Sequence, residues 1–151
     1  MSAIAIETKH AEYRAFAEIE SLVRAFEKAE IAREEWNHRA HLTVACWYLL
    51  CYPAEEAVWR MRGALQRYLS ARGIVTTREL GYHETITISW MRLVRNYLAQ
   101  TNLDCSLVEL INGLVEHYSD KDLLLRYYNR DVLMSWEARK GWIEPDVKPL
   151  P

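Results

Sequence analysis

Apolar residues recur every three or four positions through most of the chain, which is the spacing of one face of an α-helix. The clearest stripe, Phe16, Ile19, Val23 and Phe26, belongs to a first predicted helix over about residues 11–32. Similar stripes predict further long helices over about 38–52, between Pro53 and Gly73, over 83–100 and over 106–118, and short ones near 122–128 and 131–140. A period near 3.6 dominates every long segment, so the pattern predicts an all-α fold.

The ends of these segments carry the residues expected there. Asn37 is a suitable N-cap for the second helix, Pro53 is tolerated at the start of the third, and Gly73 suits its end. We expect one domain over residues 1–151. It would be an up-and-down bundle of four to five main helices, with a short helical cover from the C-terminal part. Residues 1–10 and 141–151 are expected to be extended.

Composition and charge exclude several classes of protein. The chain has 151 residues, half of them hydrophobic, with 19 basic and 21 acidic side chains and a net charge of -2. This balance offers no basic surface for nucleic acid, so no nucleic-acid partner is predicted. The longest nearly apolar stretch, residues 42–52, is too short to span a bilayer, so no membrane partner is predicted either.

The termini and the cysteines indicate the compartment. The first residues have no basic region followed by a long apolar run, so no secretory signal is predicted. The three cysteines, Cys46, Cys51 and Cys105, are odd in number and form no C-x-x-C pair. Reduced thiols in a cytoplasmic protein are therefore expected. A homo-oligomer is compatible with this composition.

Three histidines fall in the first turns of two predicted helices. His38 and His41 are three residues apart, so they share the apolar face of the second helix. His83 begins the apolar stripe of the fourth helix. Helices two and four would be parallel in an alternating bundle, and their starts would lie at the same end. The three imidazoles are therefore expected to converge there, beside the connection 74–82.

Three histidines from two helices could hold Zn²⁺ or Fe²⁺ and leave one coordination position open. Zinc would lower the pKa of a bound water to about 7 and create a nucleophile, whereas iron would allow oxygen chemistry. Glu84 follows His83 and is the expected proton acceptor, as well as the carboxylate that offsets the positive helix starts. Glu34 is an alternative carboxylate and His117 an alternative fourth ligand. This interpretation predicts a metal-dependent enzyme that acts on a small-molecule ligand.

A second interpretation needs no metal. Buried imidazoles can be satisfied by hydrogen bonds, because an unpaired polar group in a core costs roughly 1–3 kcal/mol. The protein would then be a non-catalytic helical interaction or structural module that acts through its outer surface. The many aromatic residues are open to the same two interpretations. They pack the core, or they line a pocket in which Tyr48 or Tyr82 donates a hydrogen bond to a ligand.

Two motifs resemble a known pattern. Trp36-x-His38-x-x-His41-Leu42 and Gly81-Tyr82-His83-Glu84-Thr85 resemble a family of small all-helical bacterial proteins of unassigned function. The stretch 135–150 fits the same resemblance. The resemblance implies a single helical domain and points to the same histidines. It implies no substrate, reaction or cofactor.

Overall fold

The computed structural model describes residues 12–151 and contains only helices within that part of the chain. The elements are α1 (Phe16–Glu27), α2 (His38–Cys51), α3 (Ala54–Ala71), α4 (Glu84–Gln100), α5 (Leu107–His117), the 3-10 turn η1 (Leu123–Arg126), α6 (Arg130–Leu133) and α7 (Trp136–Lys140). No strand occurs among the described residues, so the predicted all-α fold is confirmed. Residues 1–10, predicted to be extended, lie outside the described part.

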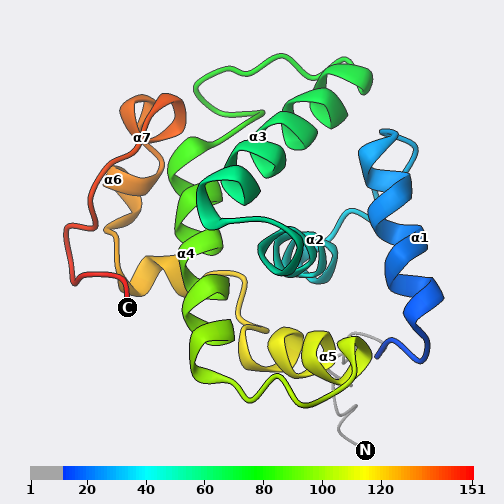
Figure 1. Cartoon of the computed structure of the whole chain (residues 1–151). Coiled ribbons are helices and arrows are strands. Elements are labelled where there is room, and N and C mark those ends of the chain that lie inside the picture. Colours follow the sequence, from blue (N-terminus) through cyan, green and yellow to red (C-terminus); the bar gives the residue numbers. More distant parts are fainter. Residues whose placement is uncertain (1–11) are drawn as a thin grey trace, which may run out of the picture.

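Helix α2 is the centre of the molecule. Figure 1 shows it end-on, with α1, α3, α4 and α5 arranged around it. Its sequence explains this position, since a helix that is apolar on nearly every side must be enclosed. The buried members of α2 are Ala40, Leu42, Thr43, Val44, Ala45, Cys46 and Tyr48. Helix α4 lies across the view of Figure 1, so α2 and α4 cross instead of running parallel.

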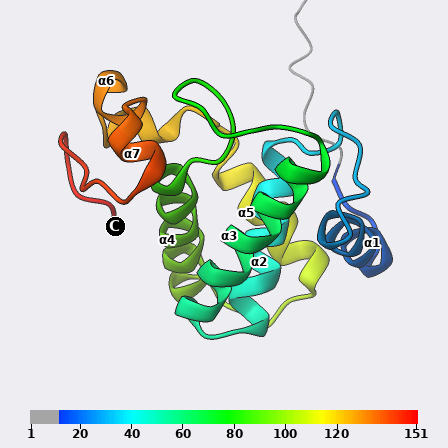
Figure 2. The ribbon, with the colours of Figure 1, turned by 90° about the horizontal axis from the view of Figure 1, so that it is seen from above.

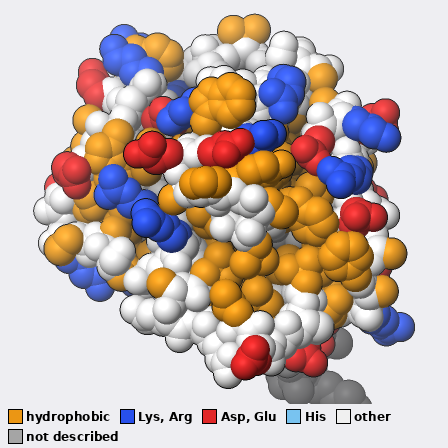
Figure 3. Space-filling view, viewed as in Figure 1, with side chains coloured by type: hydrophobic (Ala, Val, Ile, Leu, Met, Phe, Trp, Pro, Cys, Tyr) orange, Lys and Arg blue, Asp and Glu red, His pale blue; other side chains and the backbone are white. Residues whose placement is uncertain are grey.

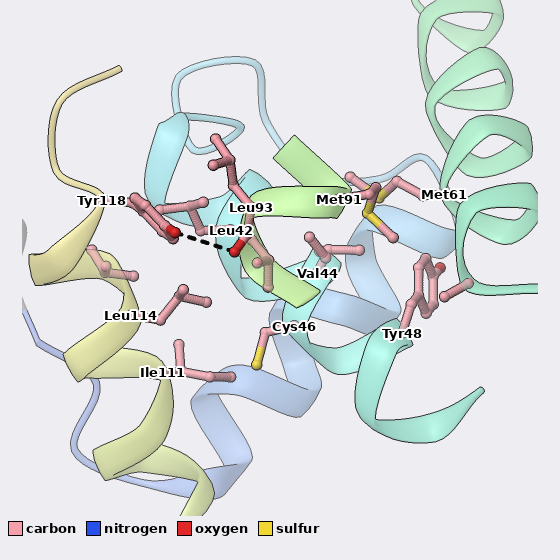
Figure 4. Close-up of a cluster of buried hydrophobic side chains, with 14 of the residues drawn as sticks. Leu42, Val44, Cys46, Tyr48, Met61, Met91, Leu93, Ile111, Leu114 and Tyr118 are labelled. Carbon is pink, nitrogen blue, oxygen red and sulfur yellow. Dashed lines mark hydrogen bonds between the residues drawn. The ribbon is translucent and has the colours of Figure 1, made fainter. Parts of the chain in front are cut away.

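The core between α2, α4 and α5 is packed with aliphatic and sulfur-containing side chains (Figure 4). Leu42 and Val44 of α2 and Leu93 of α4 belong to this cluster, and all three are buried. Each such side chain stabilises the fold by roughly 1.5–3 kcal/mol through burial. The hydroxyl of Tyr118 donates to Leu93 O at 3.2 Å, which ties the end of α5 to the middle of α4.

The first helix is shorter than predicted, and the structure gives the reason at its C-terminal end. Ala29 has a φ of 56°, the left-handed conformation that helix ends usually give to glycine. Ala29 N donates to Phe26 O at 2.9 Å and Glu30 N donates to Ala25 O at 2.8 Å. This pair of bonds is a Schellman motif, and it closes the helix. The prediction that the helix continues to residue 32 is therefore wrong.

The C-terminal part forms a helical cover, as predicted, and lies beside α4. Both Figure 1 and Figure 2 place α6 and α7 beside α4, on the side away from α1. The fully buried Thr85 fixes the chain after α7, because its hydroxyl donates to Gly141 O at 2.8 Å and accepts from Ile143 N at 3.1 Å. Tyr128 adds a hydrogen bond from its hydroxyl to Ile143 O at 2.7 Å. Residues 141–151 contain no helix, which agrees with the predicted extended tail.

The surface combines charged and apolar areas. On the face seen in Figure 3, hydrophobic side chains cover much of the centre, and charged side chains gather above them and to the left. Phe16, Leu50 and Trp59 are among the large apolar residues that stay exposed. All three cysteines are free, and only Cys46 is buried. Of the helices in residues 12–151, none has the length and apolar character needed to cross a membrane.

Candidate functional site

A cavity of about 510 Å³ lies where the first turns of α2 and α4 meet α3, α7 and the chain before α4. Its walls are mainly aliphatic and aromatic, with a few polar groups. The lining residues are Trp36, Asn37, His38, His41, Leu42, Ala45, Met61, Leu65, Leu69, Gly81, Tyr82, His83, Ile86, Thr87, Trp90, Met91 and Arg139. Trp36, His38 and His41 are each partly exposed, so solvent reaches this side of the molecule.

Local capping interactions bring the three predicted histidines to this cavity. Asn37 is the N-cap of α2, as predicted, and its side-chain oxygen accepts from Ala40 N at 3.0 Å. His83 is itself the N-cap of α4, because its Nδ1 accepts from Ile86 N at 3.1 Å. Although α2 and α4 cross, residues from both of their first turns line the cavity, and His38, His41 and His83 are all among the lining residues.

The connection before α4 forms one rim of the cavity, as the sequence predicted for residues 74–82. Gly81 and Tyr82 are both lining residues. Gly81 has a φ of 99°, and a Cβ at this position would lie 2.7 Å from the Cα of Thr76. Only glycine fits this turn without a shift of the backbone.

Two of the three histidines are bonded to backbone carbonyls. Nε2 of His38 donates to Tyr118 O at 2.7 Å, and its ring lies edge-on to Trp90 at 4.9 Å. Nε2 of His83 donates to Leu133 O at 2.7 Å while its Nδ1 serves as the cap of α4. Burial lowers the pKa of His83, and the nearby Arg139 charge acts in the same direction. His83 is therefore a neutral imidazole whose two nitrogens both have partners.

His41 differs from the other two histidines. Among residues 12–151, no hydrogen bond links its ring to another protein group. Its ring instead lies 4.2 Å from the ring of Trp36, which stacks on Phe26 at 3.9 Å. Burial, and secondarily the neighbouring His38, lower the pKa of His41 to about 4. At neutral pH it is an uncharged imidazole in the cavity wall.

The donor set does not fit the predicted Zn²⁺ or Fe²⁺ ion. His83 cannot be a ligand in this arrangement, because both of its nitrogens are engaged by protein groups. Within the described residues, no group of three or more His, Cys, Asp or Glu side chains could hold a metal ion. A positively charged arginine in the same wall also opposes a cation.

Glu84, predicted as the proton acceptor, is engaged elsewhere. Its carboxylate accepts from Arg62 Nε at 2.9 Å and from the Tyr82 hydroxyl at 2.6 Å. It is not among the residues that line the cavity. Its predicted catalytic role stays a prediction, and these contacts support a positioning role, since Glu84 holds the lining residue Tyr82 against α4.

The alternative residues lie outside the cavity lining. Glu34 is exposed in the turn before α2. His117 is exposed at the end of α5, where its ring packs against Tyr97 and Tyr118. Tyr48 is buried in the core, so Tyr82 is the tyrosine of the two that reaches the cavity.

Arg139 of α7 is a cavity residue that sequence reasoning missed. Its side chain is only 8% exposed, and its Nη1 donates to Gly81 O at 3.1 Å and to Tyr82 O at 3.4 Å. Its Nε is buried without a hydrogen-bond partner. No pattern distinguishes Arg139 from the exposed Lys140 beside it, because its burial depends on the packing of α7 against α4.

Comparison of the chain with models of protein families, with curated proteins and with solved structures finds no match. The family resemblance suggested by the two histidine motifs therefore stays a prediction.

Proposed function

We propose that this protein binds a small, flat, mainly apolar molecule in the cavity between α2, α3, α4 and α7. The observation that carries the proposal is the cavity itself, at about 510 Å³ with apolar and aromatic walls. Sites for small molecules are usually concave, within about 300–1,000 Å³, and mostly apolar with a few placed polar groups. Both the size and the lining fall within this description.

The aromatic side chains of the wall are held in place, which favours recognition of a flat ligand. Trp36 is fixed by its stack on Phe26, and Trp90 by edge contacts with His38 and Tyr118. A ligand ring that enters between such residues meets rigid surfaces, so less conformational entropy is lost on binding. His41 adds a neutral group that can donate or accept one hydrogen bond.

The test uses 2-naphthol, an uncharged bicyclic aromatic probe, and measures binding to the full chain by isothermal titration calorimetry. We expect saturable binding at one site. Thr87→Trp places an indole in the cavity wall and should weaken binding at least tenfold. Thr77→Trp makes the same change at an exposed position of the preceding connection, outside the lining, and should bind like the wild type.

Chemical shifts of the His41 ring protons locate the bound probe by NMR. A shift of these signals on titration would place 2-naphthol in the cavity. No saturable binding to the folded wild type would overturn the proposal. Equal binding by the wild type and Thr87→Trp would also overturn it.

A further inference from the structure

The guanidinium of Arg139 is a buried positive charge without an acidic partner. Its side chain is more than nine-tenths buried, and in residues 12–151 no Asp or Glu lies within ion-pair distance of it. Only Nη1 has protein acceptors, the carbonyls of Gly81 and Tyr82, and the buried Nε has none. Buried charges in proteins are normally paired, because an uncompensated one is costly.

The rest of the described cavity lining does not neutralise this charge. It contains no carboxylate, and Arg139 is its only arginine or lysine. Glu84, which follows the lining residue His83 in sequence, is paired with Arg62 at 2.9 Å. The first turns of α2 and α4 also border the cavity, and the positive ends of their helix dipoles add to the field of Arg139.

Resting on the proposed function, we infer that the ligand carries a single negative charge, a carboxylate attached to a flat apolar body, and that Arg139 recognises it. A carboxylate in the cavity would supply the negative counter-charge that the guanidinium lacks among the described residues. One arginine, with no lysine or second arginine in the described lining, matches a monoanion better than a phosphate ester.

The fold holds Arg139 firmly enough for this role. Nη1 donates to the carbonyl of Gly81 in the rim of the cavity. The backbone turn that places this carbonyl requires glycine at position 81. On the other side, Thr85 binds the chain at Gly141 and Ile143 and so holds α7 against α4. The charge is therefore presented from a fixed position, as selective recognition requires.

The experiment compares 2-naphthoate with the uncharged 2-naphthamide, which has almost the same shape, by calorimetry on the full chain at pH 7. We expect the wild type to bind the acid about tenfold or more tightly than the amide, as a charge-assisted hydrogen bond implies. Arg139→Gln should remove this preference and leave amide binding within about threefold, since only the charge-assisted contact is lost. Lys140→Gln makes the same change of charge at the exposed neighbour and should keep the preference.

The outcomes separate this inference from the proposed function. If the wild type binds both probes equally, the cavity binds apolar molecules and the anionic specificity is wrong. If the preference persists in folded Arg139→Gln, another group recognises the acid and the assignment is wrong. If neither probe binds the folded wild type, the proposed function itself fails. The comparison within the wild type also holds if Arg139→Gln does not fold.

Discussion

His41 should make the stability of the protein depend on pH in a way that a single substitution can isolate. Its pKa is lowered from 6.5 to about 4, chiefly by burial. The folded state therefore binds fewer protons at His41 than the unfolded state between these two values. The contribution of the neutral imidazole to stability is complete above about pH 6.5 and is lost as the pH falls towards 4.

The size of the effect follows from the two pKa values. Between pH 7 and pH 5, the free energy of unfolding should fall by about 2 kcal/mol through His41 alone, and by about 3 kcal/mol at pH 4. His41→Asn removes the titrating group and keeps a polar side chain. The difference in free energy of unfolding between wild type and His41→Asn should therefore change by about 2 kcal/mol between pH 7 and pH 5. Any effect of the substitution that does not depend on pH cancels in this comparison.

Urea unfolding followed by far-ultraviolet circular dichroism at pH 7, 6 and 5 measures this difference. His38→Asn is the control, because the charge of His38 is only the smaller cause of the lowered pKa. That variant should keep most of the pH dependence. A difference between wild type and His41→Asn that stays constant from pH 7 to pH 5 would refute the reasoning.

Three further substitutions test the backbone and the C-terminal cover. Ala29→Gly should raise the free energy of unfolding by about 0.5–1 kcal/mol in urea titrations, because it relieves a left-handed alanine, and an unchanged value would contradict this origin of the helix end. Gly81→Ala should lower the free energy of unfolding by about 1–3 kcal/mol and weaken binding of 2-naphthol. Unchanged stability and binding would contradict the need for glycine in this turn. Thr85→Val should cost about 1–3 kcal/mol and speed proteolysis after residue 140, detected by mass spectrometry. Thr87→Val, on the same helix but partly exposed, should do neither.

The long helices could be predicted from the sequence because their packing repeats along the chain. An apolar stripe at a period near 3.6 requires a buried face whatever the neighbours are, and α2 to α5 follow their stripes closely. The end of α1 could not be predicted in this way. Ala29 has no intrinsic preference for a left-handed φ, and the surrounding contacts impose it.

Part of the arrangement around the cavity follows from local sequence. Asn37 could be predicted as the N-cap of α2 because caps are local features, and His38, His41 and His83 near the two helix starts all line the cavity. The ring nitrogens of His38 and His83 are occupied by the carbonyls of Tyr118 and Leu133. These carbonyls are distant in sequence from the histidines, so no local pattern reveals the two hydrogen bonds. The charge of the cavity depends in the same way on Arg139, from the last helix.

The enclosed position of α2 has a consequence for how the molecule folds. An isolated α2 would expose apolar side chains on nearly all sides, and no single neighbouring helix could cover them. We therefore expect the chain to fold in one cooperative transition, without a stable intermediate built from a subset of the helices. The amide hydrogens of α2 should then exchange with solvent only when the whole molecule unfolds, whereas those of α7 can exchange through local opening.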